Sequence, residues 1–251
     1  MLGVVERGRV ASVRVALPYT DAVLGETGQP GEPVGRLNPS RFVATAPDGR
    51  QLATLLDESV IATKSAVKGG STVREALVAG GLHLTRDVLT VLADTRRQVY
   101  HADIIQRPRV SGYARMLNAP SCSRCVILAG KWYGWNKGFQ RHPRCDCLHI
   151  PASEATAEGI SIHPRDYFDS LSKEAQDKTF TKAGARAIRD GADPARVVNI
   201  NQRGLGTAKA RRRFGTPSRL TVDDIYRVAG TRENAIRLLT TEGYILPAYG
   251  R

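Results

Sequence analysis

The sequence predicts an α+β fold that is mainly α-helical. Apolar residues recur at steps of three and four over long stretches, and helix-capping residues stand in front of several of these stretches. Strand-like patterns are confined to short segments. The 251 residues provide enough chain for one sizeable domain or two small ones. No run of 18 or more apolar residues occurs, so we expect no membrane span.

Residues 1–50 carry the weakest helical signal and are expected to be irregular, with short strands. Two segments rich in β-branched residues, 10–17 and 42–46, flank a stretch of glycine and proline turns. A short helix over 21–25 is the alternative. The first residues lack a basic segment followed by an apolar one, so they do not form a signal peptide.

Residues 51–106 form a predicted helical region. Leu52, Leu55 and Leu56 mark one apolar face, and Thr72 with Glu75 forms a capping box at the start of the next helix. We expect Gly80 and Gly81 to end that helix. A further amphipathic helix of about twenty residues then covers 84–105, with its arginines, including Arg97, facing solvent.

The C-terminal region, residues 153–251, is predicted to be helical around a basic loop at 201–218. Ser172 is expected to cap a helix that continues through Phe180 to residue 188. The pair Asp193–Pro194 supplies a cap and a first-turn proline for the next helix. Thr221 opens another helix, and a last one covers 233–241.

All four cysteines of the chain fall within a 26-residue window, Cys122 to Cys147. Cys122 and Cys125 form a C-x-x-C pair, and Cys145 and Cys147 follow His142 in an H-P-x-C-x-C sequence. In a reducing compartment such thiols favour metal over disulfides, and zinc takes four tetrahedral ligands. The region 107–152 is therefore predicted to be a small zinc knuckle or hairpin with structural Zn²⁺.

The leading ligand set is the four cysteines. Two further sets, each with one histidine, remain possible. His142 replaces Cys145 or Cys147 in the rival set, and His149 is a weaker substitute. The alternative hypotheses without a metal ion are buried free thiols and disulfides. Four thiolates leave no position for a catalytic water, and no hydrolase, nucleotide-binding or deaminase motif occurs. A histidine–asparagine nuclease would need a further histidine, so we predict no enzyme.

The formal net charge of +13 indicates a polyanionic partner, nucleic acid first, and a merely arginine-rich solvated surface is an equally good interpretation. The candidate phosphate contacts are Lys209, Arg211, Arg212 and Arg213, unless this run is only a solvated loop. Aromatic residues between the cysteine pairs could stack on bases, although we favour a role in covering the metal site. These aromatic residues are Trp132, Tyr133, Trp135 and Phe139.

The cysteine window resembles the Mu-F-like head morphogenesis proteins, the minor head proteins of tailed bacteriophages and of actinobacterial prophages. The motif of that family is C-x-x-C, a glycine, H-P-x-C-x-C and a proline, matched by Cys122, Cys125, Gly130, His142, Cys145, Cys147 and Pro151. Similar segments lie at 48–52, 109–117, 167–172, 180–185, 225–229 and 235–239. The resemblance covers most of the chain from about residue 35 onward.

The resemblance implies a minor capsid protein that acts in head morphogenesis at or near the portal vertex, without catalysis. Its implied partners are the portal protein, the capsid interior and packaged DNA bound without sequence preference, and no membrane. It would reside in the virion head, and in the host cytoplasm during assembly. Members usually carry a portal-docking helical region before the position of Met1, which we expect this chain to lack. A zinc-dependent DNA-binding protein and a metallonuclease are the alternatives.

Overall fold

The computed structural model describes residues 1–138, 142–143, 145, 147–160, 162–200 and 220–246. Within them the chain is mostly helical, at 61%, with one three-stranded antiparallel sheet, which confirms the predicted α+β class. These residues form two compact units. The first is made of the described parts of 1–118 and 131–161, and the second of those of 119–130 and 162–251.

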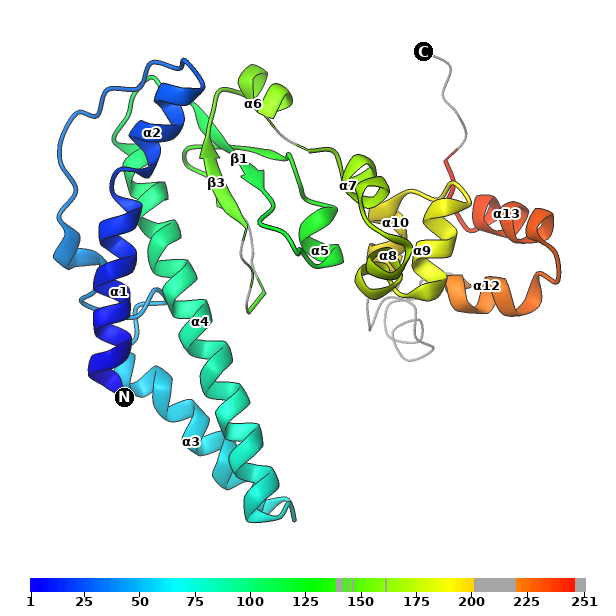
Figure 1. Cartoon of the computed structure of the whole chain (residues 1–251), viewed down its shortest axis with the longest axis horizontal. Helices are drawn as coiled ribbons and strands as arrows, with labels where there is room; N and C mark the ends of the chain where they lie inside the picture. The colour runs from blue at the N-terminus through cyan, green and yellow to red at the C-terminus, as the bar shows by residue number, and fades with distance from the viewer. Residues whose placement is uncertain (139–141, 144, 146, 161, 201–219, 247–251) are drawn as a thin grey trace. The chain divides into compact units, whose positions relative to one another are not determined.

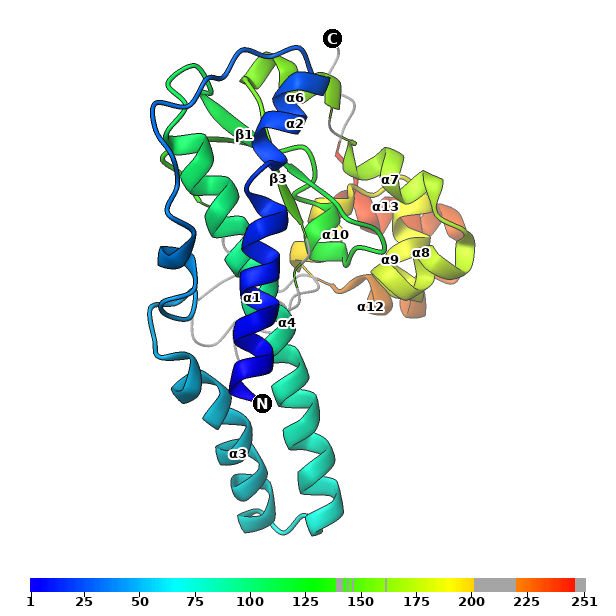
Figure 2. The ribbon, with the colours of Figure 1, turned by 60° about the vertical axis from the view of Figure 1, so that its left-hand side comes forward.

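The first unit combines long helices with the small sheet (Figure 1). Its helices are α1 (Leu2–Ala16), α2 (Tyr19–Glu26), the 3-10 helix η1 (Pro39–Phe42), α3 (Leu52–Lys68), α4 (Val73–Ile105) and α6 (Glu154–Ile160). Its strands are β1 (Gly112–Met116), β2 (Trp132–Gly134) and β3 (Leu148–Pro151). Helices α1 and α3 both lie along α4 in the two views (Figures 1 and 2).

The N-terminal segment is helical, so the strand predicted at 10–17 was wrong. Val5, Val13 and Ala16 are buried on one face of α1 together with Arg9. The Arg9 guanidinium donates to Thr95 Oγ1 of α4 at 3.1 Å and to the carbonyls of Phe42 and Thr45. Packing on α4 thus outweighs the strand preference of the β-branched residues.

The segment around residues 42–46 also forms no strand. Phe42 ends η1, and the carbonyl oxygens of Phe42, Val43 and Thr45 accept hydrogen bonds from Arg9. These carbonyls are therefore used by a side chain rather than by a neighbouring strand. The helix considered over 21–25 is present as α2.

Helix α4 continues through Gly80 and Gly81, where the sequence predicted an end. The capping box at its start is confirmed: Thr72 N donates to Glu75 Oε2 at 2.9 Å, and Glu75 N donates to Thr72 Oγ1 at 3.3 Å. Gly80 faces α3 so closely that a Cβ there would lie 1.8 Å from Thr63 Oγ1. The glycine thus serves helix–helix contact and does not end the helix.

Among the described residues, α4 is the one helix long and apolar enough to cross a bilayer by length and composition alone. Helices of soluble proteins often meet the same two criteria, and α4 also carries the buried side chains of Arg97 and Asp103. The absence of a membrane span therefore stays a prediction.

The sheet has the order β2-β1-β3, with β1 antiparallel to both neighbours. Among the described residues, β2 pairs with β1, which precedes the first cysteine pair in the sequence. Gly112 permits the approach, since a Cβ there would lie 2.2 Å from the carbonyl oxygen of Tyr133. Tyr113, at the centre, stacks on Tyr133 and on His149 with ring centroids 5.6 and 4.4 Å apart.

The second unit contains helices and no strand among its described residues. Its helices are α5 (Ser123–Val126), α7 (Pro164–Ser170), α8 (Lys173–Phe180), α9 (Lys182–Arg189), α10 (Pro194–Ile200), α12 (Val222–Val228) and α13 (Arg232–Thr241). Phe168, Ile188, Ile225 and Leu239 are fully buried within it. The basic loop predicted at 201–218 lies outside the described residues.

The helix predicted from Ser172 to residue 188 is two helices, α8 and α9. Thr181 separates them with φ of 66°, a left-handed conformation that only tertiary context imposes on a threonine. Its hydroxyl then accepts from Gly184 N at 3.2 Å and caps α9. The predicted caps Asp193 and Thr221 are confirmed, since they accept from Arg196 N and Asp224 N.

Candidate metal centre

The first cysteine pair lies at a single helical turn in the connection between β1 and β2. Cys122 is the N-cap of α5, and its carbonyl accepts hydrogen bonds from the amides of Cys125 at 2.9 Å and Val126 at 3.0 Å. Residues three apart in a helical turn are neighbours, so this turn brings the two side chains together. Cys125 is buried and Cys122 is exposed.

The second pair lies where the chain enters β3, and a buried arginine fixes its backbone. Cys145 and Cys147 are 3% and 0% exposed. Arg97 of α4 donates through Nε to the carbonyl of Cys147 at 2.9 Å and through Nη2 to the carbonyl of Cys145. Asp94 accepts from its Nη1 at 2.8 Å. Helix α4 thus positions the backbone of Cys145 and Cys147 through Arg97.

A second buried arginine contacts a candidate ligand atom directly. Arg115 of β1 is 1% exposed, and its Nη2 lies 3.7 Å from Cys145 Sγ in hydrogen-bonding geometry. Cysteine binds metal as the thiolate, whose negative charge a nearby guanidinium would partly balance. Four thiolates around Zn²⁺ would carry a net charge of about −2. Arg97 and Arg115 would offset that charge inside the protein.

The five candidate ligands cluster in two overlapping groups. The ligand atoms of Cys122, Cys125 and His142 all lie within 4.8 Å of one another, and so do those of Cys125, Cys145 and Cys147. Sulfur ligands at the corners of a zinc tetrahedron are about 3.8 Å apart, given bonds of about 2.3 Å. The spacing within each group is therefore compatible with a bound metal ion. Because His142 belongs to one group, both the four-cysteine set and the set with His142 stay open.

Two alternatives to the leading ligand sets, a disulfide and ligation by His149, find no support among the described residues. All four cysteines are free thiols in the structure, so no disulfide occupies the centre. His149 is in neither group and stacks on Tyr113 instead. The cluster of cysteines and histidine could hold a metal ion, and its donor set of sulfur and nitrogen suits Zn²⁺ better than Mg²⁺ or Ca²⁺.

Three of the four aromatic residues predicted to cover the metal site lie within the described residues. Trp132 donates from Nε1 to the carbonyl of Ala152 at 2.9 Å, and Tyr133 stacks on Tyr113. Both rings pack against the sheet, whereas Trp135 is 49% exposed. Phe139 and the candidate phosphate contacts Lys209, Arg211, Arg212 and Arg213 lie outside the described residues.

The two arginines of the centre were not predicted from the sequence. The prediction that Arg97 lies on the solvent face of its helix was wrong, because Arg97 is 3% exposed. Arg97 precedes the buried Tyr100 and Ile104 by three and seven residues, so the helical period itself places it on the buried face. No comparable signal in the sequence marks Arg115.

Comparison with known proteins assigns no family: no family model, no characterised protein and no solved structure gives a significant match to this chain. What the centre can do is therefore argued from its own donor atoms. A set of thiolates and one imidazole, backed by buried guanidinium groups, is suited to holding an ion tightly.

Proposed function

We propose that the chain is a minor capsid protein of a tailed bacteriophage, acting in head morphogenesis at or near the portal vertex. The observation that carries this proposal is the clustering of Cys122, Cys125, His142, Cys145 and Cys147, the residues of the family-like motif. The motif defines a sequence resemblance, and the clustering of its residues is compatible with the binding of a metal ion.

The zinc has a structural role in this proposal. The strands of the sheet are only five, three and four residues long, which is too little to be stable by pairing alone. An ion held by the β1–β2 and β2–β3 connections would fix both ends of β2. Structural zinc contributes directly to folding free energy in small modules of this kind. The protein is no enzyme, and its partners are the portal protein, the capsid interior and packaged DNA.

The zinc assignment is tested by removing one ligand from each pair. Cys122→Ser and Cys147→Ser should each abolish stoichiometric zinc, because a hydroxyl does not replace a thiolate on Zn²⁺. The melting temperature should fall by several degrees, since the metal contributes to folding. Zinc is measured by mass spectrometry of protein purified without chelators, alongside thermal unfolding.

Two further variants sharpen that test. Ser123→Ala changes a residue of α5 between the first two ligands and should keep both the zinc and the melting temperature. His142→Ala separates the ligand sets: retained zinc supports four cysteines, and lost zinc supports His142 as a ligand. Retention of metal and stability in both cysteine variants would contradict the zinc centre.

The role in the virion is tested in the phage or prophage that encodes the chain. The protein should be present in purified DNA-filled heads, and deletion of its gene should reduce the yield of such heads. A copy with Cys147→Ser should fail to restore the yield, while Ser123→Ala should restore it. Absence of the protein from purified particles would overturn the proposal.

The second candidate function is a zinc-dependent DNA-binding protein, which the net charge of +13 favours. It shares the metal centre but requires recognition of a particular DNA sequence. The two functions therefore differ in sequence preference and in presence within the virion, and not in zinc content.

A further inference from the structure

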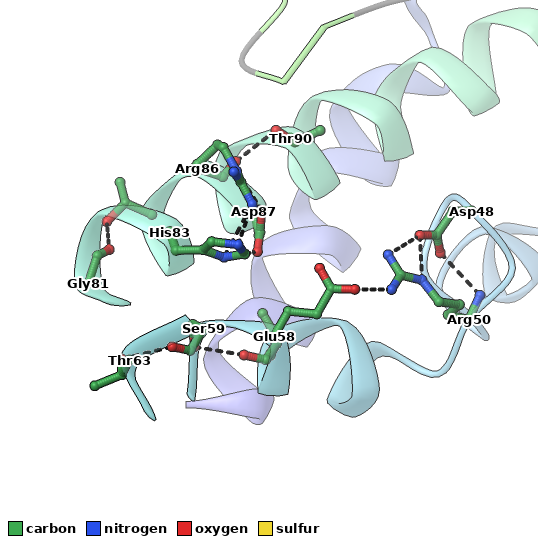
Figure 3. Close-up of polar contacts among 12 residues, drawn as sticks. Asp48, Arg50, Glu58, Ser59, Thr63, Gly81, His83, Arg86, Asp87 and Thr90 are labelled. Atoms are coloured by element: carbon green, nitrogen blue, oxygen red, sulfur yellow. Dashed lines mark hydrogen bonds and ion pairs between the residues drawn. The ribbon is translucent and has the colours of Figure 1, made fainter. Parts of the chain in front are cut away.

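A second cluster of metal-ligating side chains lies on the helical hairpin of α3 and α4, away from the cysteine window in the sequence. Glu58 comes from α3, and His83 and Asp87 come from α4 (Figure 3). One ligand atom from each lies within 4.8 Å of the other two. His83 and Asp87 are four residues apart, which places them on one face of the helix, toward Glu58.

The contact between His83 and Asp87 has the distance of an ion pair but not the geometry of a hydrogen bond. His83 Nδ1 lies 2.8 Å from Asp87 Oδ2. That oxygen is shielded from solvent, and no hydrogen bond from a described residue reaches it. Neighbouring ligands of an octahedral metal ion are about 3.0 Å apart when the bonds are about 2.1 Å long. The two atoms thus have the spacing of ligands that converge on a common point.

One oxygen of each carboxylate is held by an arginine. Arg86 Nε donates to Asp87 Oδ1 at 2.9 Å, and Arg50 forms an ion pair with Glu58 Oε1. Arg50 is itself held by Asp48, and this hydrogen bond keeps the pKa of Asp48 below its usual value. Ligating carboxylates are commonly oriented in this way by a donor on the second oxygen.

We propose that Glu58, His83 and Asp87 bind a first-row divalent cation such as Mn²⁺ or Zn²⁺, through one imidazole nitrogen and two carboxylate oxygens. Such mixed nitrogen and oxygen ligands suit Mn²⁺, Fe²⁺ and Zn²⁺. Waters would complete the coordination sphere, since three protein ligands leave positions open. This proposal is independent of the cysteine centre and of the capsid function.

One arginine has to move for the ion to bind. Arg86 Nη2 lies 2.7 Å from His83 Nε2 and 3.2 Å from Nδ1, so a guanidinium occupies the neighbourhood of the imidazole. The Arg86 side chain is 37% exposed and can turn into solvent, which would release both His83 and Asp87 Oδ1 for the ion. A permanent ion-pair network without metal is the outcome that the experiment has to separate.

The ion would tie the two helices where apolar packing is thin. Gly80 of α4 meets Ser59 and Thr63 of α3, so this part of the interface is built from small side chains. Large apolar residues of the same stretch, Leu77 and Leu82, are about 60% exposed and add nothing to the contact. A cation bridging Glu58 to His83 and Asp87 would stabilise the outer half of the hairpin.

Manganese is the probe for this site, because thiolates bind it poorly. A cysteine centre loaded with zinc would therefore not contribute to the measured Mn²⁺ binding. Full-length protein should bind one equivalent of Mn²⁺, measured by electron paramagnetic resonance of the free ion. His83→Ala, Asp87→Asn and Glu58→Gln should each weaken binding by more than about tenfold. Mn²⁺ should also raise the melting temperature of the wild type and not that of Asp87→Asn.

Asp57→Asn is the matched control, because Asp57 is exposed and adjacent to Glu58 on the same helix. It should bind Mn²⁺ like the wild type, as should Cys147→Ser if that variant folds. Circular dichroism confirms that each variant keeps its helices. If the wild type binds no stoichiometric Mn²⁺, or if the three ligand variants bind as it does, the cluster is an ion-pair network only.

Discussion

At the scale of single residues, two adjacent glycines of α4 have opposite surroundings. Gly80 is buried against α3, and a Cβ there would lie 1.8 Å from Thr63 Oγ1 and 3.2 Å from the carbonyl oxygen of Ser59. Gly81 is exposed, and a Cβ there would have no atom within 4 Å. The same residue type therefore serves close packing at one position and only weakens the helix at the next.

This difference predicts opposite effects of one substitution. Gly81→Ala should stabilise the protein by about 0.5–1 kcal/mol, because alanine loses less conformational entropy in a helix. Gly80→Ala should destabilise it by about 1–3 kcal/mol through overpacking, since Thr63 must turn and lose its hydrogen bond to Ser59. Chemical denaturation of both variants measures these free energies.

Each variant serves as the control for the other, because intrinsic helix propensity changes equally in both. A Gly80→Ala variant as stable as Gly81→Ala would show that α3 and α4 do not approach so closely at this point. The close approach of Gly80 to α3 would then be contradicted. Part of the geometry proposed for the hairpin cation site would be contradicted as well.

At the scale of secondary-structure elements, the sequence predicted most helix starts. The capping box at Thr72 and Glu75 and the caps Asp193 and Thr221 are found where they were expected. These signals are local, because a side chain within three residues of the helix start satisfies the free amides. Local signals of this kind can be recognised without knowing the fold.

The wrong predictions concern elements that depend on distant parts of the chain. Helix α1 forms because Arg9 and its apolar face are buried against α4, more than 80 residues away in the sequence. Thr181 breaks a helical pattern through a backbone conformation that threonine seldom adopts by itself. Strand β2 finds its partner in β1, across the first cysteine pair. Local propensity does not contain these contacts.

In the candidate metal centre, too, local sequence signals were predicted and contacts between distant parts of the chain were not. Residue type and spacing alone predicted the clustering of the cysteines with His142, because metal ligands are few and recur in short motifs. Arg97, Arg115 and the hairpin cluster around Glu58 were not predicted. They come from elements separated in the sequence, and their charged side chains resemble ordinary surface residues until the fold is known.

At the scale of the whole molecule, the dominant property is an excess of positive charge. The chain has 37 lysine and arginine residues against 24 acidic ones. Among the described residues, the buried lysine and arginine side chains are only Arg9, Arg97, Arg107 and Arg115. Most of the remaining charge is therefore available to solvent and to polyanions. A surface of this kind attracts the nucleic-acid backbone regardless of sequence.

We therefore expect binding to duplex DNA that depends steeply on salt and not on sequence. Affinity should fall by at least about tenfold between about 50 and 200 mM salt, because counterions are released from the phosphates. Fluorescence anisotropy with two duplexes of unrelated sequence should give equal affinities. Strong preference for one sequence would instead favour the DNA-binding regulator, and no binding at low salt would remove packaged DNA as a partner.

The basic run at 209–213 can be separated from the general charge by a matched pair of variants. One variant replaces Lys209, Arg211, Arg212 and Arg213 with alanine, and the other replaces the exposed Lys64, Lys68, Lys173 and Lys178. Both lower the net charge by four, so a purely diffuse attraction would weaken equally in the two. If the run contacts phosphates directly, only the first variant should lose most of the salt dependence, since each lost phosphate contact reduces its slope by about one.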